Sequence, residues 1–424
     1  MTRIYVGLGE TPPSGYDVVL TLGEHVLTGA EEFHARFGST TTLEDDLLNL
    51  AAAVFAVDRG IPRGQLEDFA RRIELSLPVV NAARLQPLAQ NIERVLRFLS
   101  NDSWRLSLRQ QNGAPEHEFT VPPSNGKTLL FSGGLDSLAA AAEFGNDPGL
   151  HLVSHITRNQ QTRSVQQQLV AILGESGLTL PHDQFFVSSR DAPNFDHDIE
   201  STQRTRSFLF MILGAIVARR LGHQRILMIA ENGQLAIHLP LNHARVGAFS
   251  THTAHPDAIE MMQEILQNSL SVGFHLLNPY LYRTKSEVIG ALWNQRPDAI
   301  PVAISCWRTR IPTNATHCGE CIPCFVRRIA VETHGSDTTA YARNIFNENV
   351  GALPGSDEGR RNLVDLCEFA VKFRNEGNLD LMTDWPELYS PNMDTDQAIR
   401  MYRRASSETV SVLSRYPGVA PLLQ

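Results

Sequence analysis

Cysteine is scarce in this chain of 424 residues, and the few cysteines are unevenly placed. Four of the five lie between positions 306 and 324. This distribution excludes a secreted fold held together by disulfides. Long apolar runs are also lacking, since the longest, at 208–218, is too short to cross a bilayer and has arginines on both sides. The first residues contain no apolar signal-peptide core. We therefore expect a cytoplasmic protein with no membrane partner.

Positive charge is in deficit as well. The chain has 37 Lys and Arg against 46 Asp and Glu, which gives a formal charge of −9. This balance gives no strong signal for nucleic-acid binding, although a local basic cleft is compatible with it. Internal repeats and low-complexity segments are absent from the sequence. A chain of this length is long enough for two or three domains.

The strongest chemical signal is a turn of small residues. An apolar run at 129–131 ends at Ser132-Gly133-Gly134, and a helical pattern follows. Glycines in such a turn let an anion approach the main chain, and the helix start presents N–H groups to it. The Gly-Lys-Ser/Thr ending of a P-loop is lacking, so the pattern does not indicate a P-loop NTPase. The alternative is an ordinary strand-to-helix turn.

This turn resembles the SGGxDS signature of the PP-loop ATP pyrophosphatases. In that superfamily the loop cradles the pyrophosphate of ATP, and the enzyme transfers AMP to a substrate. The matching residues, which we expect to bind ATP, are Ser132, Gly133, Gly134, Leu135, Asp136 and Ser137.

Hydrophobic periodicity divides the chain into four parts. Residues 1–120 predict an α+β N-terminal domain, structural or partner-binding, which a linker rich in Pro and Gly separates from the rest. Residues 127–305 predict an α/β catalytic domain. Residues 306–330 carry the cysteines, and residues 331–424 predict a helical tail. The expected tail helices are at 337–349, 362–375 and 394–414.

The catalytic part alternates five strands with five helices. This alternation predicts a doubly wound, five-stranded parallel sheet with helices on both faces. The expected strands are at 128–131, 152–157, 184–188, 226–230 and 275–280. In such sheets ligands bind at the carboxyl ends of the strands.

Polar residues follow two of these strands or open a helix. Arg163 belongs to a polar group after the second strand, which suits phosphate or adenine binding, and a solvated loop is the alternative. Arg204 stands at a helix start, where a positive charge opposes the helix dipole. Either a bound anion or a capped or surface arrangement explains that position.

The region after the fourth strand is the expected substrate site. Two histidines there have a spacing that also fits metal ligation, but no thiol lies nearby in sequence. Hydrogen bonding to a substrate, or a capped helix start, is therefore favoured over a metal. The expected substrate-binding residues are Glu231, Asn232, Arg245, Ser250, Thr251, His252 and His255.

Lys285 follows the last strand. Thr284 and Glu287 have the spacing of a capping box, which places Lys285 in the first turn of a helix at the ligand end of the sheet. A phosphate contact is the functional interpretation, and a surface lysine is the alternative.

The cysteines have the spacing C-x11-C-x2-C-x2-C. Four thiolates at this spacing indicate a closed, structural Zn2+ site. An iron–sulfur cluster uses similar ligands, and His317 is an alternative ligand. The expected ligands are Cys306, Cys318, Cys321 and Cys324.

Taken together, these motifs over residues 127–330 resemble the QueC family, the 7-cyano-7-deazaguanine synthases. The N-terminal region and the tail resemble the larger QatC-type proteins of bacterial anti-phage defence operons. The resemblance implies ATP- and Mg2+-dependent adenylation of the carboxylate of 7-carboxy-7-deazaguanine, followed by amide and nitrile formation with ammonia. It implies catalytic roles for Asp136 (with Mg2+), Lys285 and Arg204, and zinc ligation by the four cysteines.

One segment departs from that family. Where the synthases have Tyr-Pro-Asp-Cys-Arg, this chain has His-Pro-Asp-Ala-Ile at 255–259. We expect the substrate or acceptor to differ, and one hypothesis is transfer to an amine of a protein partner from the same operon. Two other classes stay open: a tRNA-modifying PP-loop enzyme, and an inactive nucleotide-binding scaffold of a defence complex.

Overall fold

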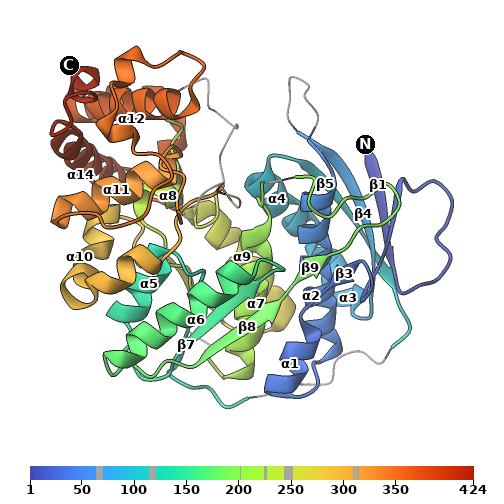
Figure 1. Ribbon diagram of the computed structural model, residues 1–424. Helices are drawn as coiled ribbons and strands as arrows, with labels where there is room; N and C mark the ends of the chain where they lie inside the picture. Colours follow the sequence, from blue (N-terminus) through green and yellow to red (C-terminus); the bar gives the residue numbers. More distant parts are fainter. Residues whose placement is uncertain are drawn as a thin grey trace.

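Two parallel β-sheets and a group of C-terminal helices make up the fold (Figure 1). The computed structural model describes residues 1–63, 70–113, 121–200, 202–223, 227–242, 252–308, 311 and 315–424. In this part of the chain no helix combines the length and the apolarity needed to span a bilayer.

The first sheet is formed by the N-terminal region. Its strand order is β2-β1-β4-β5, and every neighbouring pair is parallel. Four strands form this sheet. They are β1 (Thr2–Gly7), β2 (Val18–Thr21), β4 (Arg72–Val79) and β5 (Ser103–Gln110). The helices are α1 (Ala30–Phe37), α2 (Thr42–Gly60), α3 (Ala82–Leu85) and α4 (Ala89–Ser100), with a 3-10 turn at Gln86–Leu88.

The α+β prediction for this region is wrong, because the region is α/β. Helices α1 and α2 carry the chain from β2 to β4, and α3 and α4 carry it from β4 to β5. Each of these crossovers lets the next strand run in the same direction. Alternating burial, as in β5, identifies a strand with one exposed face but not its direction.

The second sheet confirms the predicted five-stranded parallel sheet. Its order is β11-β10-β6-β7-β8. The strands are β6 (Lys127–Leu130), β7 (Leu150–Ile156), β8 (His182–Phe186), β10 (Leu227–Met228) and β11 (Leu276–Leu277). The helices are α5 (Leu135–Glu143), α6 (Gln160–Glu175), α7 (Arg206–Arg220), α8 (Gly233–Ile237), α9 (Pro256–Leu270) and α10 (Lys285–Gln295), with a 3-10 helix at Pro297–Val302.

Helices cover both faces of this sheet, as expected. Leu129 of β6 packs in one cluster with residues of α5, α6 and α10, whereas Leu130 packs in another with residues of α7. Strand β6 lies at the centre, with β7 on one side and β10 on the other. The order of the strands reverses between β6 and β10. This is the position at which open α/β sheets form a ligand-binding crevice.

The two sheets share one hydrophobic core. Helix α2 packs against α7, and a single apolar cluster runs from β1 to β11. A short antiparallel pair, β3 (Val26–Leu27) with β9 (Ser188–Ser189), adds a second connection. The N-terminal region therefore supports the face of the second sheet that α7 covers.

The C-terminal helices pack on the side of the second sheet away from the N-terminal strands, and appear in orange and red in Figure 1. They are α11 (Ile322–His334), α12 (Glu358–Asn375), α13 (Asn378–Asp384) and α14 (Thr395–Leu413), with 3-10 turns at Ile345–Asn347, Val350–Ala352, Pro386–Leu388 and Ala420–Leu423. Helix α14 contacts α8, α10 and α11. The tail thus reaches the elements that follow β10 and β11.

The helix expected at 337–349 is wrong. Only the 3-10 turn at Ile345–Asn347 forms there. The backbone of this segment pairs instead with the cysteine segment: the N–H of Ala342 donates to His317 O (2.8 Å), and the N–H of Arg343 donates to Cys318 O (3.1 Å). Hydrogen bonds to a distant segment replace the local helical ones. The helices expected at 362–375 and 394–414 are confirmed as α12 and α14.

Candidate functional site at the carboxyl ends of the second sheet

The loop at 132–137 connects β6 to α5. Gly133 has φ +84°, a left-handed conformation that glycine adopts without strain. Gly134 is the N-cap of α5 and donates its N–H to Ser132 Oγ (3.3 Å), and Ser137 Oγ donates to Gly134 O (3.1 Å). Within the described residues no side chain caps α5. The first N–H groups of the helix are therefore suited to an incoming anion.

Lys285 and Asp136 form a buried ion pair beside this loop. Lys285 Nζ lies 2.8 Å from Asp136 Oδ2. Asn232 Nδ2 donates to the same carboxylate oxygen over 3.1 Å. Asp136 Oδ1 is buried and accepts no hydrogen bond from the residues that the structure describes. The three side chains come from α5, from the N-cap of α8 and from the start of α10, so the segments that follow β6, β10 and β11 converge at one point.

Local structure holds Lys285 at this position. The predicted capping box is confirmed, with Thr284 as the N-cap of α10 and Glu287 as its partner. The backbone N–H of Lys285 donates to Gln234 Oε1 (3.0 Å). Lys285 is buried, and a cation at a helix start opposes the helix dipole. The carboxylate of Asp136 offsets both costs. The alternative of a surface lysine is wrong.

Glu231 lies next to this ion pair. The side chain of Asn278 fixes its backbone, accepting from Glu231 N (3.2 Å) and donating to Glu231 O (2.7 Å). Burial, and then the negative charge of Asp136, raise the pKa of Glu231 to about 8, while Lys285 opposes the shift. Its Oε2 is buried and has no hydrogen-bond partner in the described part of the chain. At neutral pH this carboxyl is mostly protonated and able to donate a hydrogen bond.

A cavity of about 240 Å³ lies beside α8, which contributes to its lining. Gln234, whose side chain accepts from the N–H of Lys285, is one of its lining residues. Other lining residues come from the N-terminal region, from the segments around positions 252 and 307, and from the tail. They include Phe98, His252, Trp307, Phe369, Glu387 and Tyr402. The cavity therefore forms only when all parts of the chain are folded together.

His252 and His255 pack against Phe98 of α4. The ring centroids of Phe98 lie 4.9 Å from His252 and 5.2 Å from His255. His255 is the N-cap of α9, and its Nδ1 accepts from the N–H of Asp257 (3.2 Å), which confirms the expected helix cap. Burial, followed by the neighbouring His255, lowers the pKa of His252 to about 3. His252 is thus neutral at physiological pH and lines the cavity.

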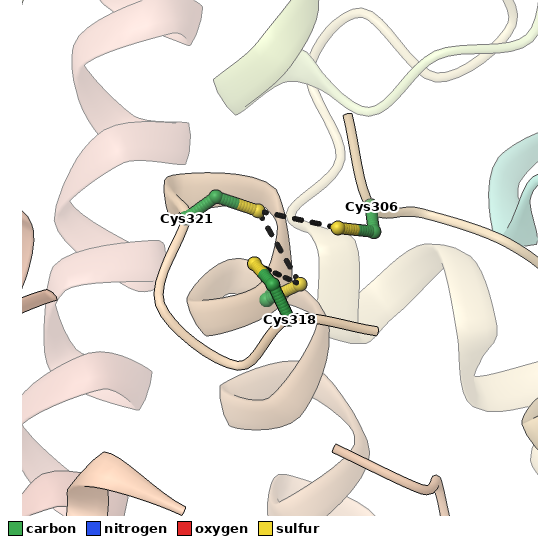
Figure 2. A group of neighbouring side chains, drawn as sticks. Cys306, Cys318 and Cys321 are labelled. Atoms are coloured by element: carbon green, nitrogen blue, oxygen red, sulfur yellow. Dashed lines mark hydrogen bonds between the residues drawn. The ribbon is translucent and has the colours of Figure 1, made fainter. Parts of the chain in front are cut away.

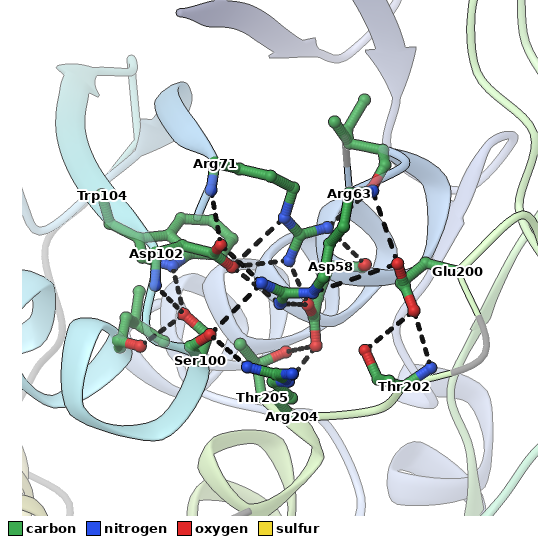
Figure 3. A network of polar contacts seen from close by, with 12 residues as sticks. Asp58, Arg63, Arg71, Ser100, Asp102, Trp104, Glu200, Thr202, Arg204 and Thr205 are labelled. Atoms are coloured by element: carbon green, nitrogen blue, oxygen red, sulfur yellow. Dashed lines mark hydrogen bonds and ion pairs between the residues drawn. The ribbon is translucent and has the colours of Figure 1, made fainter. Parts of the chain in front are cut away.

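Arg204 lies in a buried polar network between the N-terminal region and the start of α7 (Figure 3). Its Nη1 donates to Ser100 O (3.2 Å). Asp58 of α2 accepts from both the N–H (2.9 Å) and the hydroxyl (3.1 Å) of Thr205, the N-cap of α7. An acidic side chain from another segment therefore satisfies this helix start, and no bound anion is needed. A contact between Arg204 and a phosphate stays a prediction.

The same network contains two further arginines and two further acids. Asp102 accepts from Arg63 Nη1 (2.7 Å) and from the backbone N–H of Arg71 (2.8 Å). Glu200, from the segment before α7, accepts from Thr202 (Figure 3). The network buries as many arginines as acidic side chains, so their charges balance. Removing any one of them would leave a buried charge without its partner, and the network therefore fixes how the N-terminal region packs against the start of α7.

The remaining predicted residues have different outcomes. Arg163 is exposed in the first turns of α6, and its role at the nucleotide stays a prediction. Arg245, Ser250 and Thr251 lie outside the described residues. Ser132, Gly133, Gly134, Leu135, Asp136, Ser137, Glu231, Asn232 and Lys285 are gathered at the β6, β10 and β11 ends.

The four predicted cysteines form a cluster that could hold a metal such as zinc (Figure 2). Neighbouring sulfur atoms are 3.3 Å (Cys321–Cys324), 3.8 Å (Cys318–Cys324) and 3.9 Å (Cys306–Cys321) apart. Tetrahedral zinc with Zn–S distances of about 2.3 Å has sulfurs roughly 3.8 Å apart. The donor set and its spacing therefore fit Zn2+.

His317 is not a member of this cluster among the described residues. Its Nε2 accepts from the N–H of Ser305 (3.0 Å), and its Nδ1 bonds Thr316 Oγ1 (2.8 Å). In addition, the N–H of Ile304 donates to Gly133 O (3.0 Å). The segment that leads into the cysteine cluster therefore also holds the backbone of the 132–137 loop at Gly133.

Several residues of the site were not predicted from the sequence. Gln234, Phe98 and Tyr402 carry no motif, and they reach the site only through tertiary packing. Glu408 of α14 accepts from Thr284 Oγ1 (2.9 Å) and so links the tail to the N-cap of α10. Comparisons with protein-family models and with curated proteins found no match. The functional argument therefore depends on the geometry of the site.

Proposed function

We propose that this chain is a PP-loop-type, ATP-dependent ligase that adenylates a carboxylate, with 7-carboxy-7-deazaguanine as the candidate substrate. The observation that carries the proposal is the meeting of the 132–137 loop with the Asp136–Lys285 ion pair at the switch point of a parallel sheet. That position is where α/β sheets bind nucleotides. The order of the five strands is also compatible with a PP-loop fold.

The proposed reaction begins when a carboxylate oxygen of the substrate attacks the α-phosphorus of ATP. Pyrophosphate leaves, and an acyl-adenylate forms. The N–H groups at the start of α5, Ser132 and Lys285 are suited to the negative charge of the departing pyrophosphate. An amine or ammonia then attacks the activated carbonyl carbon, its nitrogen loses a proton to water, and AMP leaves with the electron pair of the broken C–O bond.

Two acidic side chains suit a divalent cation. Asp136 Oδ1 and Glu231 Oε2 are buried oxygens without a hydrogen-bond partner among the described residues. Such oxygens are the ligands that Mg2+ prefers. When bound, Mg2+ would neutralise phosphate charge. When Glu231 keeps its proton instead, it is placed to donate a hydrogen bond to the substrate.

The acceptor is either ammonia or an amine of a protein partner. The altered segment at 255–259 includes His255, which caps α9 and packs on Phe98 of the N-terminal region. The N-terminal region thus contacts the segment that differs from the synthases. This contact favours an acceptor other than free ammonia, such as an amine of a protein from a defence operon.

Mass spectrometry of the products tests this proposal. The full chain is incubated with ATP, Mg2+ and 7-carboxy-7-deazaguanine, with ammonium, with a protein of the same operon as acceptor, or with neither. We expect AMP in every reaction that contains an acceptor, together with an amide or nitrile when ammonia is that acceptor. AMP without a small-molecule product would point to a protein acceptor. A complete absence of AMP with Mg2+ and either acceptor source would contradict the proposal and favour the scaffold alternative.

A further inference from the structure

The cavity beside α8 has the chemistry of a binding site for a flat, uncharged ring. Aromatic rings from three parts of the chain line it, namely Phe98, Trp307, Phe369 and Tyr402. Rings of this kind offer stacking surfaces to a planar heterocycle. Among the described lining residues none is Lys or Arg. The cavity therefore suits an uncharged ring better than a phosphate.

The walls of the cavity are fixed before any ligand binds. The hydroxyl of Tyr402 donates to Gln234 O (3.2 Å) and accepts from the N–H of Leu239 (3.2 Å). Trp385 Nε1 donates to Pro240 O (2.8 Å). The tail is thus hydrogen-bonded to the segment that follows β10. Prearranged walls lower the entropic cost of binding.

Two buried polar atoms at the cavity have no partner among the described residues. They are Glu387 Oε2, in the 3-10 turn at Pro386–Leu388, and His252 Nδ1. Unpaired buried polar atoms are costly, so a ligand that supplies hydrogen bonds would be favoured. A carboxylate accepts hydrogen bonds, and so the matching edge of the ligand must donate them.

The volume sets a further limit. About 240 Å³ lies below the roughly 300–1,000 Å³ of sites for drug-sized ligands, so the cavity fits a compact two-ring molecule. Gln234 lies between the cavity and the backbone of Lys285. Through Gln234 the cavity adjoins the start of α10, which carries Lys285.

We propose that this cavity binds the base of a guanine-like substrate, with Glu387 accepting hydrogen bonds from the ring N–H and the exocyclic amine. This inference rests on the proposed function, which supplies the carboxylate at the opposite edge. Glu387 belongs to the tail and Phe98 to the N-terminal region, so both of these regions contribute to the substrate site. Their role in specificity goes beyond a structural or partner-binding role.

Calorimetric titration with two bases tests the inference without ATP or turnover. 7-Deazaguanine has a donor edge, whereas 7-deazaadenine has an acceptor nitrogen at the same position. We expect 7-deazaguanine to bind the full chain at least ~10-fold more tightly. Glu387→Gln should weaken 7-deazaguanine binding by ~10–100-fold, the effect of losing hydrogen bonds to a charged group. Glu368→Gln, an exposed position on α12, is the matched control and should bind like the original chain.

A second variant separates stacking from edge recognition. Phe98→Leu keeps an apolar side chain but removes the ring, so it should weaken both bases to a similar extent. Equal affinity for the two bases, unchanged binding by a folded Glu387→Gln variant, or no binding of 7-deazaguanine would overturn the inference. None of these results bears on AMP formation by the 132–137 loop, which the product analysis tests separately.

Discussion

Lys285 Nζ and Asp136 Oδ2 lie 2.8 Å apart and join the start of α10 to the start of α5. Both groups are buried, and each is expensive to bury alone. The pair therefore has to form for either charge to be tolerated, and Asn232 supports it through the same oxygen. A buried cation next to an uncapped helix start suits a site for a polyanion.

Replacing Lys285 should therefore affect both activity and stability. Lys285→Met leaves Asp136 without its ion-pair partner, which we expect to cost roughly 3–5 kcal/mol and to lower AMP formation by ~100-fold or more. Lys372→Met, on α12, is the matched control and should retain activity. The double variant Asp136→Asn with Lys285→Met should recover part of the unfolding midpoint but none of the activity. Full activity in a folded Lys285→Met variant would remove Lys285 from the mechanism.

The two loop glycines should respond differently to alanine. Gly133 has φ +84°, and an added Cβ would lie 3.1 Å from Gln166 Cγ. Gly134 has φ −86°, and its added Cβ would lie 3.3 Å from Ile304 O. We expect Gly133→Ala to be destabilised by ~1–2 kcal/mol through strain, and to bind ATP more weakly than Gly134→Ala. Nucleotide titration and urea unfolding of both variants measure this, and the reverse order would contradict it.

Glu231 predicts a pH dependence of stability. Its folded-state pKa of about 8 lies above the ordinary value of 4.5, so between these values the folded state holds a proton that the unfolded state has released. Stability from this group should therefore fall as pH rises from about 4.5 to 8. Glu231→Gln removes this contribution. Urea midpoints from pH 5 to 9 should show a flatter profile for the variant than for the original chain, whereas parallel profiles would disprove the assignment.

The cysteine cluster predicts one bound metal ion. Cys321→Ser should lower zinc content and destabilise the fold, because metal binding contributes to folding at closed thiolate sites. Cys367→Ala is the control, since Cys367 lies on α12 and outside the cluster. Elemental analysis of both variants gives the metal content. Equal zinc content in both would show that the cluster does not bind it.

Much of the second sheet followed from local patterns. The turn at Ser132, the five strands and the capping box at Thr284 each depend on residues close together in sequence, and such signals are readable without a structure. The metal site could be predicted from the four cysteines, because their spacing allows turns that place four thiolates around one tetrahedral ion.

Other features depend on contacts between distant segments. The direction of the N-terminal strands is set by their crossovers, and residues 337–349 pair with the cysteine segment instead of forming a helix. The start of α7 accommodates Arg204 because Asp58 satisfies Thr205, and nothing local to Arg204 encodes that. Glu387 lines the cavity from a turn next to Trp385, which donates a hydrogen bond to the distant Pro240 O.

Exchange of labelled pyrophosphate into ATP, driven by 7-carboxy-7-deazaguanine, tests the central claim most directly. Exchange reports reversible acyl-adenylate formation and needs no acceptor. We expect exchange with the original chain and with the control Asp380→Asn, which changes an exposed residue of α13. Asp136→Asn should lower it by ~100-fold or more. Carboxylate-dependent exchange that is equal in Asp136→Asn and Asp380→Asn, or no exchange in the original chain, would contradict adenylation at this site.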